Sequence, residues 1–176
     1  MSLYVYIAQS LDGYIADKNG DIDWLMDIPN PENSDFGFAE FMSKIDAVVM
    51  GRNTFEKVNS FGVWSYTKPV YVISASLHDL PQKYSGEVEI LNLKPKQIIE
   101  TLEKEGMKNL YIDGGSLIQS FLSEDLIDEL IITSIPVLLG GGIPLFGKLN
   151  NSLKFKFQKS EVLNNSLVKS HYKRDK

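Results

Sequence analysis

Residues 109–123 read NLYIDGGSLIQSFLS, and this stretch decides the fold. Its first five residues form a short apolar run that is typical of a strand, and residues 115–123 have a helical pattern. Gly114 and Gly115 stand between the two, where the chain must turn from one element into the next. A strand that leads directly into a helix is the unit from which parallel α/β sheets are built.

The same alternation extends to both sides of this unit. Short runs rich in Val, Ile and Tyr recur along the chain, and helical patterns separate most of them. The predicted strands cover 3–8, 46–50, 69–74, 87–91, 109–113 and 128–135, and the predicted helices cover 35–44, 53–59, 95–105 and 115–123. This pattern predicts an α/β fold of three layers, αβα, around a mixed, mostly parallel central sheet of about eight strands.

The C-terminal part of the chain has a different pattern. Residues 153–163 alternate apolar and polar side chains, and a second run covers 167–172. The Asn-Asn-Ser segment at 164–166 suits a turn, because asparagine tolerates left-handed backbone geometry. We therefore predict an antiparallel hairpin at the edge of the sheet. Two irregular loops, 28–34 and 140–147, are expected near the functional site.

Composition excludes several classes of function. The 176 residues, 43% of them hydrophobic and 23% charged, fit a single domain over 1–176. A net charge of −5 opposes binding to nucleic acid. The chain has no cysteine and two histidines, so we expect no metal site. No apolar run approaches the roughly 20 residues of a membrane span and no basic leader begins the chain, so we expect a cytoplasmic protein with no membrane partner.

Gly51-Arg52-Asn53-Thr54 follows an apolar strand and begins a predicted helix. A helix N-terminus carries free N–H groups and a partial positive charge, so it binds anions. Gly51 permits close approach of a ligand to the backbone, and Arg52 adds a full charge. The alternative is an ordinary turn in which Asn53 or Thr54 caps the helix.

Two further strand ends have a similar composition. Asp113-Gly114-Gly115-Ser116 joins a strand to a helix, where paired glycines suit either a pyrophosphate or a tight turn. Ser74-Ala75-Ser76 follows the strand at 69–74 with small and hydroxyl-bearing side chains, which are also common in turns. Because ligands of open α/β sheets bind at the carboxyl ends of the strands, we expect the three ends to converge on one ligand.

Several motifs in this order resemble one family. They are SLDGYIAD (10–17), Trp24, VVMGRNTFE (48–56), YVISAS (71–76), LYIDGGSLIQSFL (110–122) and PVLLGGGIPLF (136–146). Together they resemble the dihydrofolate-reductase-like family that includes the C-terminal reductase domain of the bifunctional riboflavin-biosynthesis deaminase/reductase. The resemblance implies a dihydrofolate-reductase-like fold and NADPH as the cofactor.

The resemblance also assigns residues to parts of NADPH. It implies that the backbone of Ala8 and Ile15 contacts the nicotinamide amide and that Ser74, Ala75 and Ser76 lie near the adenosine end. The phosphates are assigned to Gly51, Arg52, Asn53, Thr54, Gly114, Gly115, Ser116 and Leu117. It further implies a cis peptide between Gly114 and Gly115. Leu117 departs from the family, because many dihydrofolate reductases have an arginine there, so the preference for NADPH depends on Arg52 and the serines.

The residue that anchors the substrate is less clearly marked. In dihydrofolate reductases a buried carboxylate near the start of the helix before the MGR motif holds the substrate ring, and counting back from Met50 places Asp35 there. Counting forward from Trp24 gives Asp27 as a rival, and Asp12 is a third candidate. The alternative for Asp35 is a helix N-cap.

The sequence therefore predicts an NADPH-dependent reductase that transfers hydride to a small heterocycle. The substrate is expected to resemble either the ribosylaminopyrimidine of the riboflavin pathway or a dihydropterin such as dihydrofolate. The alternative is a homodimeric protein that binds NADP(H) without turnover. The family resemblance implies a homodimer in either case, and the edge hairpin leaves a strand available for pairing.

Overall fold

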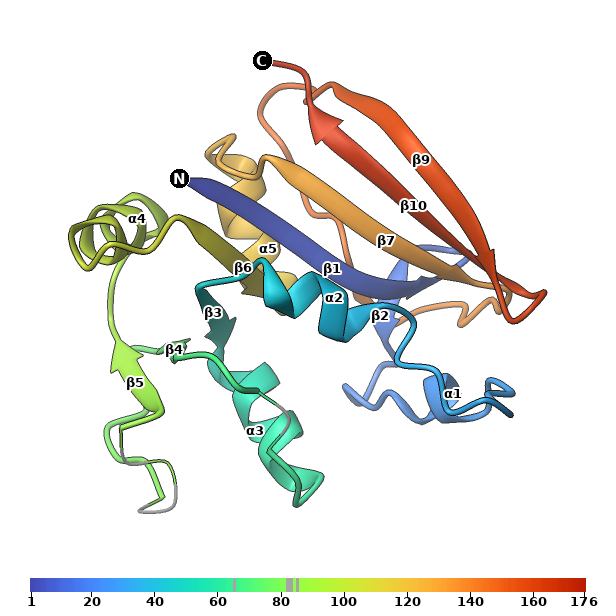
Figure 1. Ribbon diagram of the computed structural model, residues 1–176, viewed down its shortest axis with the longest axis horizontal. Helices are drawn as coiled ribbons and strands as arrows, with labels where there is room; N and C mark the ends of the chain where they lie inside the picture. The colour runs from blue at the N-terminus through green and yellow to red at the C-terminus, as the bar shows by residue number, and fades with distance from the viewer. Residues whose placement is uncertain (65, 82–83, 85) are drawn as a thin grey trace.

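One eight-stranded sheet runs through the computed structural model, which describes residues 1–64, 66–81, 84 and 86–176 (Figure 1). The strand order is β5-β4-β3-β6-β1-β7-β10-β9. Six neighbouring strands run parallel: β5 (Val88–Leu91), β4 (Val70–Ile73), β3 (Ala47–Gly51), β6 (Asn109–Asp113), β1 (Ser2–Ser10) and β7 (Glu129–Ile135). The antiparallel hairpin of β9 (Phe155–Leu163) and β10 (Leu167–Arg174) completes the sheet at one edge.

Helices cover both faces of the parallel part of the sheet. One face packs against α4 (Pro95–Lys104) and α5 (Gly115–Ser123), and the other packs against α2 (Phe38–Ser43) and α3 (Arg52–Ser60). The side chains of β6 show why both faces are covered, because they alternate between two hydrophobic cores. Leu110 and Ile112 belong to the first core and Tyr111 belongs to the second. This arrangement confirms the predicted three layers and the mixed, mostly parallel sheet.

Three short elements lie outside the predicted pattern. β2 (Tyr14–Ala16) and β8 (Ile143–Pro144) form a separate two-stranded sheet, and α1 (Asp23–Met26) follows β2. The glycine-rich loop makes the small sheet possible, since a Cβ on Gly142 would collide with the backbone oxygen of Ala16. A strand of two or three residues, or a helix of four, is too short to repeat its period of hydrophobicity.

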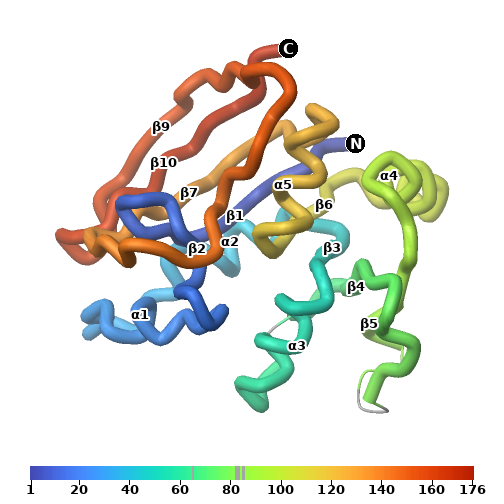
Figure 2. The backbone as a smooth tube through the Cα atoms, turned by 180° about the vertical axis from the view of Figure 1, so that it is seen from behind, coloured from blue at the N-terminus to red at the C-terminus, as the bar shows by residue number. Residues whose placement is uncertain are grey.

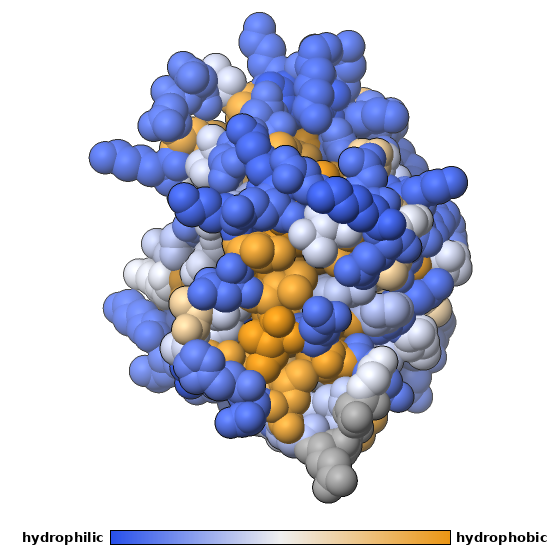
Figure 3. Space-filling view, turned by 90° about the vertical axis from the view of Figure 1, so that its left-hand side faces the viewer, coloured by the Kyte–Doolittle hydropathy of each residue, from blue (hydrophilic) through white to orange (hydrophobic). Residues whose placement is uncertain are grey.

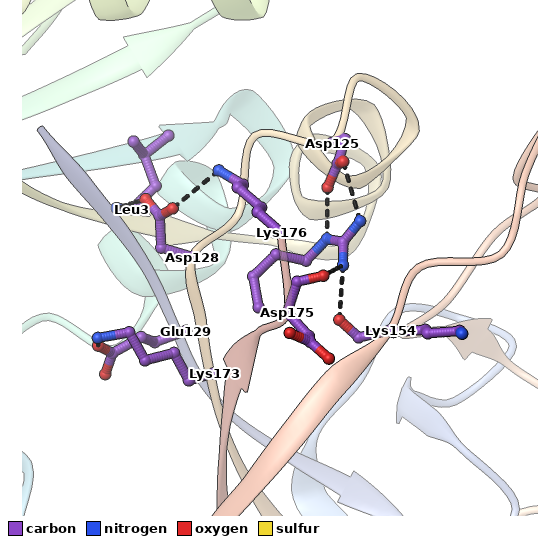
Figure 4. A network of polar contacts seen from close by, with 9 residues as sticks. Leu3, Asp125, Asp128, Glu129, Lys154, Lys173, Asp175 and Lys176 are labelled. Atoms are coloured by element: carbon purple, nitrogen blue, oxygen red, sulfur yellow. Dashed lines mark hydrogen bonds and ion pairs between the residues drawn. The ribbon is translucent and has the colours of Figure 1, made fainter.

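The hairpin is fixed at both of its ends. Asn164 and Asn165 have φ values of 47° and 53°, as expected for a left-handed turn. At the other end the Arg174 guanidinium binds the Asp125 carboxylate with N···O distances of 2.6 and 3.0 Å, and Lys176 lies 3.0 Å from Asp128 (Figure 4). These contacts hold the end of β10 against the connection between α5 and β7.

The opposite edge of the sheet leaves apolar surface accessible. Figure 3 shows the side of the molecule on which β5 and α4 lie, with apolar surface at its centre and polar side chains around it. Leu91 and Leu93 at this edge are partly buried and pack on the core. Among the described residues, no helix has both the length and the apolar character that crossing a membrane requires.

Candidate active site

A cavity of about 490 Å³ lies at the carboxyl ends of the parallel strands. Its lining includes Ala8 of β1, Gly51 at the end of β3, Ile73 at the end of β4 and Asp113 at the end of β6. Figure 2 shows α3 and α5 leaving the sheet at the neighbouring strands β3 and β6. A volume in this range is typical of sites that hold a small molecule or a cofactor.

The N-terminus of α3 faces this cavity. Gly51, Arg52, Asn53 and Thr54 all line it, and no side chain caps the helix. The alternative in which Asn53 or Thr54 caps α3 is therefore not what the structure shows. The first N–H groups of the helix remain available to an anion.

The N-terminus of α5 reaches the same place. Gly114, Gly115, Ser116 and Leu117 line the cavity, and α5 also lacks a side-chain cap. Gly114 has φ +92° and ψ 133°, and a Cβ there would collide with the side chain of Thr54. The absence of a side chain at Gly114 thus lets the N-terminus of α5 lie against that of α3. The first residues of both helices line the same cavity.

The predicted cis peptide between Gly114 and Gly115 is wrong, because this bond is trans. The chain makes the turn into α5 through the positive φ of Gly114 instead. Only glycine adopts this conformation without steric cost, so the residue type is required although the bond is not cis.

The third strand end lies beside the cavity rather than in it. Ser74, Ala75 and Ser76 are not among its lining residues, although the preceding Ile73 is. The Ser74 hydroxyl accepts hydrogen bonds from the N–H groups of Ser76 and Leu77, as in an ordinary turn. Ser76 is linked to the site indirectly, because Arg52 Nη1 donates to its hydroxyl at 2.9 Å.

Arg52 itself is shared between two partners. Its Nε lies 2.6 Å from Glu56 Oε1, one helical turn along α3, and both side chains are about half exposed. An ion pair at such exposure contributes little to stability. The guanidinium therefore has donors available to an anion at the cavity.

Apolar residues form the remaining walls. Ala8 and Ile15 line the cavity as the family resemblance requires, together with Ile22, Leu25 and Ile143. Ile143 belongs to the predicted site loop 140–147. None of the residues of loop 28–34 lines this cavity, so the expectation for this loop is wrong. The Asn164 side chain donates to its Pro29 oxygen at 3.1 Å near the hairpin turn.

The structure does not bring the three predicted carboxylates into the cavity. Asp35 is exposed, and its carboxylate accepts hydrogen bonds from the N–H groups of Ala39 and Gly37 at 2.8 and 2.9 Å, which lowers the pKa of Asp35. The predicted burial of Asp35 is therefore wrong. Asp35 is not the N-cap residue of α2, which is Gly37, but its carboxylate binds N–H groups at the start of this helix. Asp27 is also exposed.

Asp12 has a structural role. Its carboxylate is hydrogen-bonded to the Ser10 hydroxyl and accepts from the N–H groups of Gly140 and Leu139, and these contacts lower the pKa of Asp12. Asp12 thereby holds the glycine-rich loop to the end of β1. Its position outside the lining makes it a support of the site.

Among the described residues, Asp113 is the carboxylate that lines the cavity, and no sequence pattern assigned it a role of its own. It is surrounded by protein and meets accessible space at the cavity. The Tyr66 hydroxyl donates to its Oδ2 at 3.2 Å, and the nearby Tyr111 hydroxyl donates to the backbone oxygen of Tyr6 at 2.9 Å. Burial raises the pKa of Asp113, and the hydrogen bonds with Tyr66, Tyr111 and the Gly114 N–H offset part of this rise.

One sequence signal was available for Asp113. It directly precedes the glycine pair and ends an otherwise apolar strand, where a charged side chain faces the ligand end of a parallel sheet. Its two tyrosine partners were less accessible to prediction. Tyr111 shares its face of β6, but Tyr66 comes from a loop that no local pattern connects to β6.

The sheet order and the three layers define the class of protein: an α/β protein with the dihydrofolate-reductase-like fold. The match to a family model is more specific, because the model of the RibD C-terminal domain matches residues 2–169. The chain therefore belongs to the RibD C-terminal domain family, and it is a reductase of the riboflavin-pathway kind. A similar curated protein is Uncharacterized protein YwjB of Bacillus subtilis, 39% identical over 97% of this chain and 96% of its own length.

Solved structures agree with this assignment. A putative riboflavin biosynthesis protein from Shewanella sp. PV-4 is 51% identical with a TM-score of 0.96, and each chain is covered completely. The deaminase/reductase of Thermotoga maritima has a TM-score of 0.76 at 16% identity, over 99% of this chain and 56% of that one. Dihydrofolate reductase from Enterococcus faecalis, complexed with NADP(H), has a TM-score of 0.71 at 16% identity over 99% and 97%, which shows the shared fold.

Proposed function

We propose that the protein is an NADPH-dependent reductase that transfers hydride to a small heterocyclic substrate. The observation that carries this proposal is the convergence of two uncapped helix N-termini on one cavity. Two such N-termini suit a pyrophosphate, because their free N–H groups and helix dipoles stabilise its negative charge without an additional side chain. The NADP(H) complex of the Enterococcus faecalis enzyme, which shares the fold, supports the choice of cofactor.

The residues present fit NADPH. The N–H groups that follow Gly51 and Gly114 would hold its pyrophosphate, since a Cβ at Gly114 would fill the space between the helices. Arg52, whose guanidinium donates to the Ser76 hydroxyl, would hold the 2′-phosphate on the adenosine ribose. The backbone of Ala8 and Ile15 would orient the nicotinamide against an apolar wall. The cofactor supplies the hydride, and the protein supplies binding, orientation and exclusion of water.

Asp113 is the polar anchor that we propose for the substrate. It lies in the same cavity as the helix N-termini proposed to bind phosphate, and Ala8, Ile15, Ile22 and Leu25 form apolar parts of the walls. A flat heterocycle fits such a slot when its polar edge meets one buried carboxyl group. The riboflavin-biosynthesis name of the Shewanella protein and the (phosphoribosylamino)uracil-reductase name of the Thermotoga protein favour a ribosylaminopyrimidine over a dihydropterin.

The test has two stages. NADPH is titrated by fluorescence, and the absorbance of bound NADPH is then followed with the ribosylaminopyrimidine and with dihydrofolate. We expect binding of NADPH and oxidation with the pyrimidine. Binding without oxidation of NADPH by either compound would favour a nucleotide-binding protein without turnover. Failure to bind NADPH at all would contradict both functions.

We also propose that the protein forms a homodimer through its C-terminal hairpin. Phe157, Val162 and Val168 are 59%, 67% and 43% exposed, and the three lie on one face of β9 and β10. Large apolar side chains gathered on an exposed sheet face are typical of an interface. Light scattering should give the mass of two chains for the wild type and of one chain for Val162→Glu. A wild type with the mass of one chain would contradict this.

A further inference from the structure

A second cavity, of about 200 Å³, lies apart from the candidate active site. Its lining comes from α2 with the residues that flank it and from four neighbouring strands of the sheet, β1, β7, β10 and β9. Among the described residues, none lines both this second cavity and the first one at the strand ends. Its volume is below the range of about 300–1,000 Å³ that is usual for ligand pockets, so it suits a ligand of about one ring.

One row of side chains across the sheet contributes to the second cavity. The row consists of successive cross-strand partners from β9, β10, β7 and β1: Lys159, His171, Ile131 and Tyr6. Because directly opposite residues of neighbouring strands point to the same face, these side chains lie side by side. Ile131 makes the middle of the row apolar, and the buried Phe41 of α2 adds an apolar wall. The row carries a lysine at its β9 end.

The carboxylates of the second cavity already have partners within the chain. These pairs are Glu161–Lys169 at 2.8 Å, Glu129–His171 at 2.7 Å and Glu40–Lys44 at 3.1 Å. Lys169 is also bound to the backbone oxygen of Phe36 at 2.8 Å. Lys159 is the lysine of this lining that has no carboxylate partner among the described residues. The unmatched charge of the second cavity is therefore positive and lies on β9.

The Tyr4 hydroxyl is a further polar group of the second cavity. It has no hydrogen-bond partner among the described residues, and it is not buried. Tyr4 belongs to β1, three strands away from Lys159. The rings of Tyr6 and Phe41 lie near it and stack with their centroids 4.6 Å apart. The end of the cavity opposite Lys159 is thus aromatic.

We propose that the second cavity is a binding site for a small monovalent carboxylate that carries an aromatic ring. Lys159 binds the carboxylate, and the ring lies over Ile131 towards Phe41. One unmatched cation suits a single negative charge, whereas a phosphate dianion would bring a second charge close to Glu129 and Glu161 without a partner. The aromatic wall favours a ring over an open chain. This site does not depend on the proposed reductase function.

The proposed homodimer leaves the second cavity accessible. Val162 and Val168, which belong to the proposed interface, are cross-strand partners in the hairpin, as are Glu161 and Lys169 of the cavity. Neighbouring side chains of a strand point to opposite faces, so the two pairs lie on opposite faces of the hairpin. A ligand can therefore enter the second cavity in the monomer and in this dimer.

Benzoate is the probe for this site, and amide NMR spectra of the protein without NADPH locate it. Benzoate should shift the resonances of Ile131 and His171 and leave those of Asn53 and Ser116, at the first cavity, unchanged. Benzyl alcohol has the same ring without the charge. It should bind at least about tenfold more weakly, because the charge-assisted hydrogen bond with Lys159 is missing.

Lys159→Gln removes the proposed carboxylate partner from an exposed position. It should weaken the binding of benzoate at least about tenfold and leave that of benzyl alcohol unchanged. Lys156→Gln is the matched control, because Lys156 also belongs to β9 but lies outside the lining and pairs with Asp175 at 2.7 Å. This variant should bind benzoate as the wild type does.

Three results would overturn the proposal. They are shifts confined to the amides of the first cavity, equal affinity of the wild type and Lys159→Gln for benzoate, and no shift at millimolar benzoate. The last result would mean that the ion pairs of the second cavity only hold α2 and the hairpin to the sheet. All these measurements use the protein without cofactor, so a failure to bind NADPH would not change their outcome.

Discussion

Gly114 is required to be glycine for two reasons: its backbone conformation and its close contact with Thr54. Its φ of +92° and ψ of 133° are costly for any other residue, and a Cβ would also collide with the Thr54 side chain. We expect Gly114→Ala to cost more than about 2 kcal/mol and to abolish NADPH binding, because it separates the two helix N-termini.

Gly106→Ala is the matched control for this substitution. Gly106 has φ +87°, but a Cβ there meets no atom within 4 Å. This variant should lose about 1 kcal/mol from its backbone conformation alone and bind NADPH normally. Chemical denaturation and NADPH titration of both variants are the measurements. Equal losses in the two would show that the contact with Thr54 has no energetic importance.

Asp35 gives a prediction about how the stability of the fold depends on pH. The N–H groups of Ala39 and Gly37 lower the pKa of Asp35, so its contribution to stability is present at neutral pH and is lost as pH falls through the lowered pKa. Asp35→Ala should lower the melting temperature at neutral pH, match the wild type at low pH and leave NADPH binding unchanged. A loss of NADPH oxidation with full binding would instead return Asp35 to the candidate catalytic residues.

At the scale of elements, the helix N-termini differ in what they have left to bind. α3 and α5 begin with residues that line the cavity, Arg52 to Thr54 and Gly115 to Leu117, whereas no residue of α4 lines it. NADP⁺ should therefore shift the amide resonances of Asn53 and Ser116 and slow their hydrogen exchange. The amides at the start of α4 serve as the internal control and should not respond. Equal effects on all three helices would argue against a phosphate site.

The elements also show how far prediction from sequence reaches. The strands of the main sheet and the helices α2 to α5 were predicted because each is long enough to repeat a period of two or 3.6 residues. Short elements such as α1 and β8 depend on contacts made by distant residues, so no local pattern reveals them. The same reason explains Asp113. Its position in the sequence was plain, but its importance comes from Tyr66, 47 residues away, and from burial that only the assembled fold produces.

At the scale of the whole molecule, a ligand that joins α3 to α5 should stabilise the entire fold. The cavity is lined by residues of β1, β3, β4 and β6, so its occupant contacts four parallel strands of the sheet at once. A ligand that binds the folded state alone stabilises it by about 2.7 kcal/mol at 100 times its dissociation constant. For a chain of this size that corresponds to a rise in melting temperature of roughly 5–10 °C. Thermal unfolding at increasing concentrations of NADPH should show this rise.

Arg52→Ala tests the preference for NADPH. This variant should require at least about tenfold more NADPH for the same rise in melting temperature, because a charge-assisted hydrogen bond is lost. NADH lacks the 2′-phosphate on the adenosine ribose, so it should stabilise the wild type less and should not distinguish the wild type from Arg52→Ala. If NADH and NADPH stabilise the wild type equally, Arg52 does not bind that phosphate, and the cavity has no preference between the two nucleotides.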